Sequence, residues 1–470
     1  MKRRLRVYKK TVSIVNETAI GMYESLVGNK KGFLLESYDK NYDRYTFFGK
    51  EPEEIITSRG DALVIRQNNG TEEIRKGNPL ERLKEYYSEF DIVKENEELS
   101  FSGGLVGNLG YDFVRYAEVL PDNNPDEIGI ETIQMMLMTK FILVDHVAET
   151  LTAVILGEDS EDGKKKALAE AAELIEEARK NAGQIPDRNF THDGVIVNQS
   201  DTLEQYCEKV EKIKQYIREG HIFQTVLSQR WTIETKQTGF ELYKELRELN
   251  PSPYLYYFNY GDFEVIGSSP EMIVKQQGSR VYTCPIAGTR RRGVDAEEDA
   301  LLRDELLRDE KERAEHVMLV DLARNDMGRI SEFGTVKVTQ FMEVQNYSHV
   351  MHIVSMVEGK KKGEFHPLDL VSSFLPAGTL SGAPKIRAME IIDELESVRR
   401  GLYGGATGYI DFSGDMDFCI TIRTMIKKKN RVYLQAGAGI VADSVPENEY
   451  QECCNKVMAL AKTLIEEENL

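Results

Sequence analysis

The spacing of hydrophobic residues changes along the chain. Before about residue 160, compact apolar runs predict strands at residues 44–49, 62–67, 135–145 and 151–157. Residues 167–180 are rich in alanine and glutamate, and Leu168, Leu174, Ile175 and Ala178 recur on one side, which predicts an exposed amphipathic helix. The polar flanks of this helix make residues 157–198 the most plausible seam between an N-terminal half, residues 1–185, and a C-terminal half, residues 198–465, which we expect to intertwine.

Helices and strands alternate unevenly after this seam. Ser200 or Asp201 is placed to cap a helix that Gly220 ends, and a strand-like run follows at residues 221–234. Such mixing of strands, hairpins and helices predicts an α+β protein with antiparallel sheets, not a doubly wound array. Further helices are predicted from about Glu297 to Asp326, from near Ser381 with Pro384 in its first turn, and from about Pro446 to the C-terminus.

The composition indicates an acidic globular protein. The 470 residues include 79 acids against 60 bases, giving a formal net charge of −19 and a pI of about 5.1. Nucleic acid is not expected as the main partner, because duplex-binding surfaces carry the opposite sign. No run approaches about 18 uncharged apolar residues, so no membrane span is expected, and the basic start lacks the apolar region of a secretory signal. The five cysteines form no C-x-x-C pair, which favours reduced thiols and a cytoplasmic location.

Two predicted helices carry paired carboxylates. Glu312 and Glu315 share one helix face, and Glu449 and Glu452 repeat that spacing, with Lys456 one turn further along. Two such pairs facing one point would suit Mg²⁺, which takes oxygen ligands and keeps waters that a substrate anion can replace. Acids are so frequent in this chain that the pattern alone favours a solvated helix surface over a metal site.

Glycine-rich segments and embedded polar residues are candidates for anion binding. QAGAGI at 435–440 follows a predicted strand and TLSGAPK at 379–385 opens a predicted helix, so either can turn N–H groups toward an anion, although an ordinary tight turn fits equally well. Arg423, His352 and Gln224 interrupt apolar runs and need partners if buried. A lone histidine in such a run is more often a satisfied core residue than a catalyst. No nucleophile elbow or Walker sequence occurs.

A series of longer motifs runs through nearly the whole chain, from about residue 30 to 460. They are LLES (34–37), RYTFFG (44–49), GGLVG (103–107) with GYD (110–112), IFQTVLSQR (222–230), NPSPY (250–254), GSSPE (267–271), PIAGTR (285–290), DEKERAEH (309–316), DLARND (321–326), LSGAPK (380–385), GLYGG (401–405) and QAGAGI (435–440). In this order they resemble the chorismate-utilising enzyme family, and within it the anthranilate synthase component I group. So many long motifs in one order are far more specific than any single glycine loop.

This resemblance implies a four-layer α/β/β/α fold with two mostly antiparallel sheets, and chorismate as the substrate. It implies that Glu315 and Glu452 are Mg²⁺ ligands, with Glu312 and Glu449 in the same cluster, and that the ion holds the ring carboxylate of chorismate. Cations and N–H donors would grip the two substrate carboxylates, as a dianion requires. The residues that match the family's substrate-binding positions are Gln224, Ala287, Gly288, Thr289, Tyr403, Arg423, Gly437, Ala438, Gly439 and Lys456.

The resemblance also implies catalytic roles. Glu271 matches the general acid that protonates the departing 4-hydroxyl group, a role that requires a pKa raised by a closed pocket. Thr379 and His352 match residues that line the ring, and His352 is the candidate for assisting loss of the enolpyruvyl side chain. Lys311 lies among the acids and is expected to balance their charge.

Two positions discriminate among members of the family. Relatives that add water carry a lysine base where this chain has Gln224, and many aminodeoxychorismate synthases carry a nucleophilic lysine where it has Ala287. Without either lysine, ammonia is expected to attack C2 directly, and loss of the 4-hydroxyl and of pyruvate gives anthranilate, in the first committed step of tryptophan biosynthesis. The chain has no glutaminase nucleophile, so a separate glutamine amidotransferase subunit is expected to supply the ammonia.

Two alternatives to this function remain open from the sequence. The nearer one is the aminodeoxychorismate synthase subunit of folate synthesis, because some of those enzymes also lack the lysine. The more distant one is a non-catalytic amino-acid sensor that kept the fold, although the intact set of Glu271, Glu315, Glu452 and Lys456 argues against it.

A second site for L-tryptophan, as a feedback inhibitor, is implied in the N-terminal half. Glu36 would pair with the ammonium group and Ser37 would hydrogen-bond, beside a rigid loop and an apolar slot for the indole. Cys419 matches a position coupled to this site and is expected on the strand that carries Arg423. The alternative is that these segments only pack the core. The loop residues that match the family's site are Asn250, Pro251, Ser252, Pro253 and Tyr254.

Overall fold

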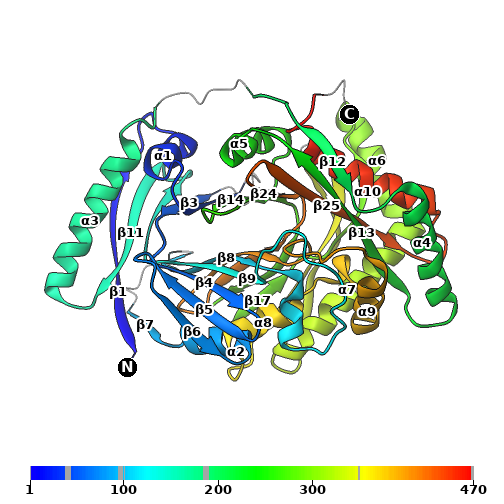
Figure 1. The fold of residues 1–470 in the computed structure, drawn as a ribbon, viewed down its shortest axis with the longest axis horizontal. Coiled ribbons are helices and arrows are strands. Elements are labelled where there is room, and N and C mark those ends of the chain that lie inside the picture. The colour runs from blue at the N-terminus through cyan, green and yellow to red at the C-terminus, as the bar shows by residue number, and fades with distance from the viewer. Residues whose placement is uncertain are drawn as a thin grey trace.

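The computed structural model describes residues 2–37, 44–93, 99, 101–183, 190–347 and 350–466, and two large sheets run through them (Figure 1). In spatial order, the first sheet consists of β12 (Val195–Gln199), β13 (Gln224–Glu234), β25 (Arg431–Ile440), β24 (Thr424–Lys428), β15 (Glu264–Ser269), β14 (Tyr254–Asn259), β2 (Gly32–Glu36), β3 (Tyr45–Lys50), β10 (Lys140–Asp145), β11 (Thr150–Glu158), β1 (Arg3–Ser13) and β7 (Phe90–Val93), with β21 (Gly382–Ala383) paired to β13.

The second sheet has a comparable size. In spatial order it consists of β18 (Ile286–Arg291), β20 (Val350–Lys360), β17 (Arg280–Thr283), β16 (Met272–Gln277), β23 (Met416–Ile420), β22 (Ala406–Asp411), β8 (Gly104–Leu109), β9 (Ile133–Met138), β4 (Glu54–Arg59), β5 (Ala62–Gln67) and β6 (Glu72–Lys76), with β19 (Lys337–Asn346) paired to β20. Within the described residues, the strand pairs are antiparallel except for the parallel pair of β1 and β7.

The two sheets pack face to face and helices cover their outer faces (Figure 1). Side chains alternate across each strand, so one set fills the space between the sheets, including Phe33, Phe47, Phe141 and Phe258, while the other set meets the helices. The predicted four-layer α/β/β/α fold is therefore confirmed. The first sheet is covered by α1 (Ala19–Leu26), α3 (Glu161–Arg179), α4 (Leu203–Arg218), α5 (Gly239–Leu249), α9 (Lys385–Leu395) and α10 (Pro446–Ala461), and the second by α2 (Pro79–Tyr87), α7 (Glu310–Ile330) and α8 (Pro367–Phe374).

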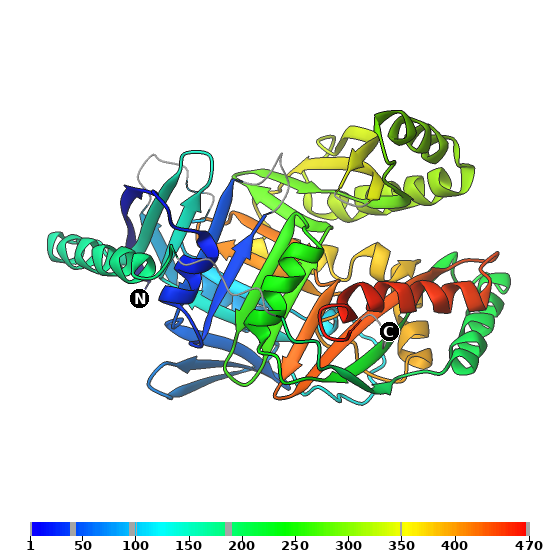
Figure 2. The ribbon, with the colours of Figure 1, turned by 90° about the horizontal axis from the view of Figure 1, so that it is seen from above.

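Strands from both predicted halves of the chain share each sheet, as β3 and β14 in the first and β8 and β22 in the second illustrate. The predicted boundary at residue 185 lies outside the described residues. Helix α6 (Ala296–Arg308) and the β19–β20 hairpin form a lobe that projects from the side of the sandwich (Figure 2). Among the described helices, none has the length and apolarity needed to cross a bilayer.

Two helix boundaries differ from their predicted positions because of local capping side chains. Helix α4 is capped by Thr202, which forms a capping box with Gln205, and not by Ser200 or Asp201. The single long helix predicted from about 297 to 326 is two helices, because Asp309 ends α6 and its carboxylate caps the first amides of α7. Both differences follow from side chains that satisfy N-terminal amides, a signal that apolar spacing does not carry.

The predicted structures of two glycine-containing segments were also wrong. QAGAGI is not a turn after a strand, because β25 continues through it to Ile440. The segment predicted to open a helix near Ser381 instead contains the short 3₁₀ helix η2 (Gly378–Leu380) and β21, and α9 begins only at Lys385. Pairing with β13 organises both segments, and that long-range contact is not visible in the sequence.

Candidate active site

A cavity of about 240 Å³ opens between the lobe and the edge of the sandwich. Its walls come from β18, β20 and α7 on the side of the lobe, from β13, β25 and α10, and from the links β15–β16 and β23–β24. The predicted residues that line it are Gln224, Glu271, Ala287, Thr289, Glu315, His352, Thr379, Tyr403, Arg423, Gly437, Gly439, Glu452 and Lys456. Folding thus brings most of the predicted active-site residues to one place, although they come from distant parts of the chain.

Glu271 lies in the two-residue link between β15 and β16, where the chain passes from the first sheet to the second. Thr379 donates a hydrogen bond from Oγ1 to Oε1 of Glu271 over 2.9 Å. Burial raises the pKa of Glu271 to about 8, against the opposing effects of the Thr379 hydrogen bond and the positive charge of Lys456. The carboxyl group is therefore protonated at neutral pH and can donate a proton to a group in the cavity.

His352 lies on β20 and faces the same cavity. Its Nδ1 is 3.0 Å from the carbonyl oxygen of Gly288 and 3.1 Å from Oγ1 of Thr289. A carbonyl oxygen only accepts, so Nδ1 carries the hydrogen and Nε2 keeps its lone pair. Burial lowers the pKa of His352, aided by the positive charge of Arg423, so the imidazole is neutral at neutral pH and can accept a proton.

Arg423 is the most constrained cation of the cavity. It does not lie on the strand of Cys419 as predicted, but between β23 and β24, where the chain changes sheets with a φ of +51°. Such a φ is costly for a residue with a side chain. Burial lowers the pKa of Arg423, and within the described residues no carboxylate forms an ion pair with it. A buried guanidinium of this kind needs an anion.

A second cation and two glycines complete this wall. Nζ of Lys456 donates to the carbonyl oxygen of Gly437 over 2.9 Å and to Oε1 of Glu452 over 2.5 Å. A Cβ at Gly437 would lie 2.9 Å from Oη of Tyr403, and one at Gly439 would lie 2.7 Å from Nε2 of Gln224. Glycine is required at 437, where a Cβ would also lie 3.0 Å from the carbonyl oxygen of Leu227, whereas at 439 only the end of the Gln224 side chain is in the way.

The acidic residues on α7 and α10 repel one another across the cavity. Burial raises the pKa of Glu315, with further contributions from Glu312 and Glu452 and opposition from Lys311. Burial likewise raises the pKa of Glu449, and Glu452 adds to the effect. Mutually repelling carboxylates are oxygen donors suited to a hard cation. In the described part of the chain, no three His, Cys, Asp or Glu side chains come together as a metal-binding group. A hard cation held here by two carboxylates would keep several waters.

The remaining predicted residues do not line the cavity. Lys311 and Glu449 lie within electrostatic reach of it, and Glu312 accepts a hydrogen bond from Nη1 of Arg290 over 3.2 Å. Gly288 acts through its carbonyl oxygen, which holds His352. Ala438 is buried on the other face of β25, against the cluster formed with α4 and α9, because side chains alternate along a strand.

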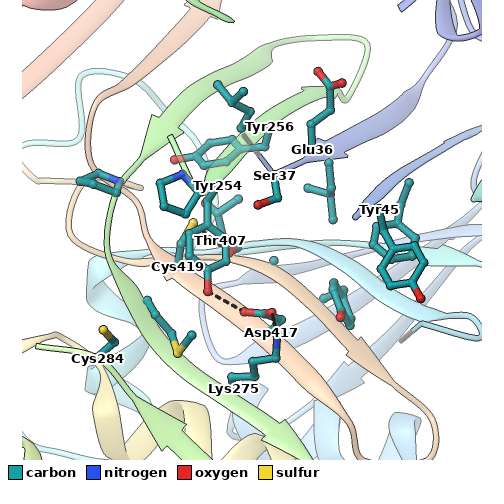
Figure 3. Close-up of a pocket in the computed structure, with 18 of the residues that line it drawn as sticks. Glu36, Ser37, Tyr45, Tyr254, Tyr256, Lys275, Cys284, Thr407, Asp417 and Cys419 are labelled. Atoms are coloured by element: carbon teal, nitrogen blue, oxygen red, sulfur yellow. Dashed lines mark hydrogen bonds and ion pairs between the residues drawn. The ribbon is translucent and has the colours of Figure 1, made fainter. Parts of the chain in front are cut away.

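A second cavity, of about 180 Å³, lies between the two sheets (Figure 3). Its lining includes Glu36, Ser37, Pro253, Tyr254 and Cys419 from the predicted tryptophan site, whereas Asn250, Pro251 and Ser252 lie outside it. Aromatic and apolar side chains form most of its surface, including Tyr45, Phe47, Tyr256 and Met272. Pro270 and Ile286 line both this cavity and the first one, so a single layer of residues separates the two.

Two carboxylates of the second cavity have partners within the chain. The carboxylate of Glu36 accepts hydrogen bonds from Tyr243 over 2.5 Å and from Nε of Arg247 over 2.8 Å. Asp417, which the sequence did not single out, lies in the cavity, where it accepts from Tyr254 and pairs with Lys275, each over 2.9 Å (Figure 3). Alternation along β23 places Asp417 and Cys419 on the same face, and that spacing was the available sequence signal.

Known proteins that are similar to this chain identify its family. The chorismate binding enzyme family model matches residues 33–462. Two proteins named anthranilate synthase component 1 are similar to the chain: that of Acetivibrio thermocellus is 46% identical over 96% of this chain and 93% of the relative, and that of Thermus thermophilus is 43% identical over 98% of each.

Solved structures agree with this assignment. The crystal structure of anthranilate synthase component I from Streptococcus pneumoniae matches with a TM-score of 0.77 and 39% identity, over 89% of this chain and 92% of that one. The menaquinone-specific isochorismate synthase of Escherichia coli shares the fold, with a TM-score of 0.73 at 18% identity over 98% of this chain and 94% of that one. The extent and identity of these matches show that the chain belongs to the chorismate binding enzyme family.

Proposed function

We propose that the chain is the component I subunit of an anthranilate synthase, which converts chorismate and ammonia to anthranilate, pyruvate and water. One observation carries the proposal: a protonated carboxyl group, Glu271, shares a cavity with two cations, Arg423 and Lys456. Chorismate is a dianion with a hydroxyl leaving group, so it requires both features. The similarity to proteins named anthranilate synthase component 1 supports the same reaction.

The reaction proceeds by addition and then elimination. Ammonia attacks C2, the two conjugated ring double bonds shift to C1–C6 and C4–C5, and the C4–O bond breaks while Glu271 gives its proton to the departing hydroxyl, which leaves as water. Neutral His352 then accepts the proton from C2 through Nε2 as the C3–O bond breaks, the ring becomes aromatic and the side chain leaves as pyruvate. Gln224 and Ala287 line the cavity without offering a lysine to activate water or to attack C2.

We further propose Mg²⁺ as cofactor, held by Glu315 and Glu452 with Glu312 and Glu449 nearby. When bound, the ion would neutralise the ring carboxylate of chorismate. Arg423, Lys456 and Tyr403 line the same cavity and bind and orient the substrate there.

A glutamine amidotransferase subunit is proposed as the source of ammonia. Burial raises the pKa of the Cys207, Cys284, Cys419 and Cys453 thiols, which disfavours the thiolate that a glutaminase nucleophile requires. The designation component 1 of the similar proteins also supports a second subunit.

A product assay tests the function directly. The chain, incubated with chorismate, Mg²⁺ and ammonium, is expected to form fluorescent anthranilate and one equivalent of pyruvate, which lactate dehydrogenase can measure. Formation of 4-amino-4-deoxychorismate without pyruvate would assign the chain to folate synthesis instead. If the chain forms no product from chorismate, it would be a binding protein without this catalytic activity.

Replacement of Ala287 by lysine is expected to reduce anthranilate formation by about 100-fold. Ala287 lines the cavity on β18, and a lysine there would fill the space that ammonia needs or attack C2 itself, where displacements of about 1 Å cost that much. Ala287→Met is the matched control, because it fills the space without an amine. A wild-type rate for Ala287→Lys would contradict the placement of Ala287 at C2.

We propose that L-tryptophan binds the second cavity and inhibits the enzyme. The aromatic lining suits an indole, and Asp417 and Lys275 supply both charge signs for an amino-acid zwitterion. The shared wall at Pro270 and Ile286 offers a short connection to the catalytic cavity. Binding must be reciprocal, so tryptophan and chorismate should weaken each other's binding by the same factor.

Replacement of Ser37 by phenylalanine is expected to abolish tryptophan binding while leaving uninhibited activity intact. Ser37 lines the second cavity and not the first, so a large ring there fills only the inhibitor site. Calorimetry with L-tryptophan on both proteins measures the effect. An absence of binding to the wild type, or equal inhibition of both proteins, would refute this site.

A further inference from the structure

We propose that Arg400 is a positioning residue for the chorismate reaction, because its guanidinium joins three segments of the catalytic cavity wall. Arg400 lies between α9 and β22 and is only 2% exposed. It does not line the cavity itself. The inference rests on the proposed function, since positioning is defined by the reaction it supports.

The guanidinium makes a directed contact with each of the three segments. Nη1 donates to the carbonyl oxygen of Leu380 over 2.5 Å, and Nη2 donates to that of Val226 over 2.9 Å. Cζ lies 5.6 Å from the centroid of the Tyr403 ring, within the range of a cation–π contact. Leu380, Val226 and Tyr403 all line the cavity, on η2, on β13 and on the GLYGG segment respectively.

A buried carboxylate holds Arg400 itself in place. Glu396 accepts from Nε and Nη2 of Arg400 over 2.9 and 2.7 Å, and it also accepts from the amide and hydroxyl of Ser228 over 2.8 and 2.7 Å. Ser228 in turn accepts from Nε2 of Gln435, another cavity residue, over 2.8 Å. The network therefore reaches from α9 through β13 to β25 with its donors and acceptors paired.

The geometry of this network requires arginine specifically. A planar guanidinium presents five donors in fixed directions and can bond a carboxylate on one edge while donating to two carbonyl oxygens on the others. An ammonium group has three donors on a flexible stem and cannot reproduce these contacts together with the ring contact. Lysine at position 400 therefore keeps the charge and loses the fixed geometry.

One catalytic contact depends on a segment that Arg400 holds. Thr379, adjacent to Leu380 on η2, donates the hydrogen bond to Glu271. The charged and titratable groups that interact electrostatically with Glu271 are Lys456 and Cys284. If η2 shifts, the Thr379 hydrogen bond weakens. Since that bond favours the ionised carboxylate, the pKa of Glu271 should then rise further.

The test measures kinetics and pH dependence of Arg400→Lys at a constant concentration of uncharged ammonia. We expect kcat/KM for chorismate to fall by about 10- to 100-fold, with most of the loss in kcat, because a small misplacement of catalytic groups has effects of this size. We also expect the decline of kcat/KM at alkaline pH to move to higher pH, as in Thr379→Val, which removes the hydrogen bond directly.

A matched control separates positioning from stability. Arg75 is also a largely buried arginine, paired with Glu73 and Glu89 and placed over the ring of Tyr86, but it lies on β6, at the far edge of the second sheet from β18. Arg75→Lys should lower the melting temperature and leave kcat/KM and its pH profile unchanged.

Two results would overturn the inference, and a third would refute only the proposed function. If folded Arg400→Lys keeps the wild-type kcat/KM and pH profile, the inference is overturned. If that variant does not fold, Glu396→Gln, which retains the side-chain shape, replaces it and is expected to show a smaller loss with the same alkaline shift, and an unchanged profile overturns the inference. A wild-type chain that makes no anthranilate would refute the proposed function, not the placement of Arg400.

Discussion

Replacement of Glu271 by glutamine is expected to lower kcat for anthranilate formation by about 100- to 10,000-fold, the usual contribution of a general acid. Glutamine keeps the size of the side chain and can still bond Thr379, but it has no proton to give to the departing hydroxyl. Chorismate should still bind, because Arg423 and Lys456 are untouched. Steady-state kinetics and a binding titration with chorismate distinguish the two effects.

The wild-type pH profile gives an independent check on the same group. Burial raises the pKa of Glu271 to about 8, so the carboxyl is protonated below that pH and ionised above it. At a constant concentration of uncharged ammonia, kcat/KM should be flat from neutral pH, where His352 is unprotonated, to about pH 8 and fall tenfold per unit above it. This decline should be absent from the residual activity of Glu271→Gln. A wild-type profile that rises through pH 8 would contradict the role of Glu271 as acid.

Replacement of Glu315 or Glu452 by glutamine is expected to abolish Mg²⁺-dependent turnover while the fold survives. Each variant removes one of two anionic donors from a site with few protein ligands, which weakens the binding of a hard cation strongly. The free energy of unfolding offers a readout besides activity. Mg²⁺ should raise the melting temperature of the wild type, because a ligand that binds the folded state stabilises it, and should not raise that of either variant.

Asp321→Asn is the matched control for the metal site. It lies on the same helix as Glu315, α7, but its side chain is 63% exposed and pairs only with Arg324 among the described contacts. Its rate and its Mg²⁺ dependence should equal those of the wild type. Should Glu315→Gln or Glu452→Gln retain both, the proposed metal ligands are wrong.

Much of the lining of the first cavity could be predicted, because the motifs that the chain shares with the family identify residues by type and order. The chemistry of Glu271, His352 and Arg423 required particular side chains, and each of these lines the cavity as the resemblance implied. The partners of a buried side chain were harder to predict. Glu36 lines the second cavity, and its pairing with an amino-acid ligand stays a prediction. Its carboxylate is also bound by Tyr243 and Arg247, and neither partner is close to it in sequence.

The apolar runs show most clearly what the sequence predicts and what only the structure reveals. The sequence alone determined an α+β protein rich in strands, because buried strands need continuous apolar residues. Three stretches that look locally like single strands or simple links are instead crossings between the two sheets: Thr139 between β9 and β10, Pro270–Glu271 between β15 and β16, and residues 421–423 between β23 and β24.

Only the tertiary structure decided what these crossings do. A residue at a crossing belongs to neither sheet, so its side chain can point into the space at the edge of the sandwich, and Glu271 and Arg423 reach the catalytic cavity in this way. Burial there raises the pKa of Glu271 and leaves Arg423 without an ion-pair partner among the described residues. Residue identity thus determined which chemistry was available, while the long-range pairing of strands determined where it is concentrated, because burial and proximity arise only from contacts between distant segments.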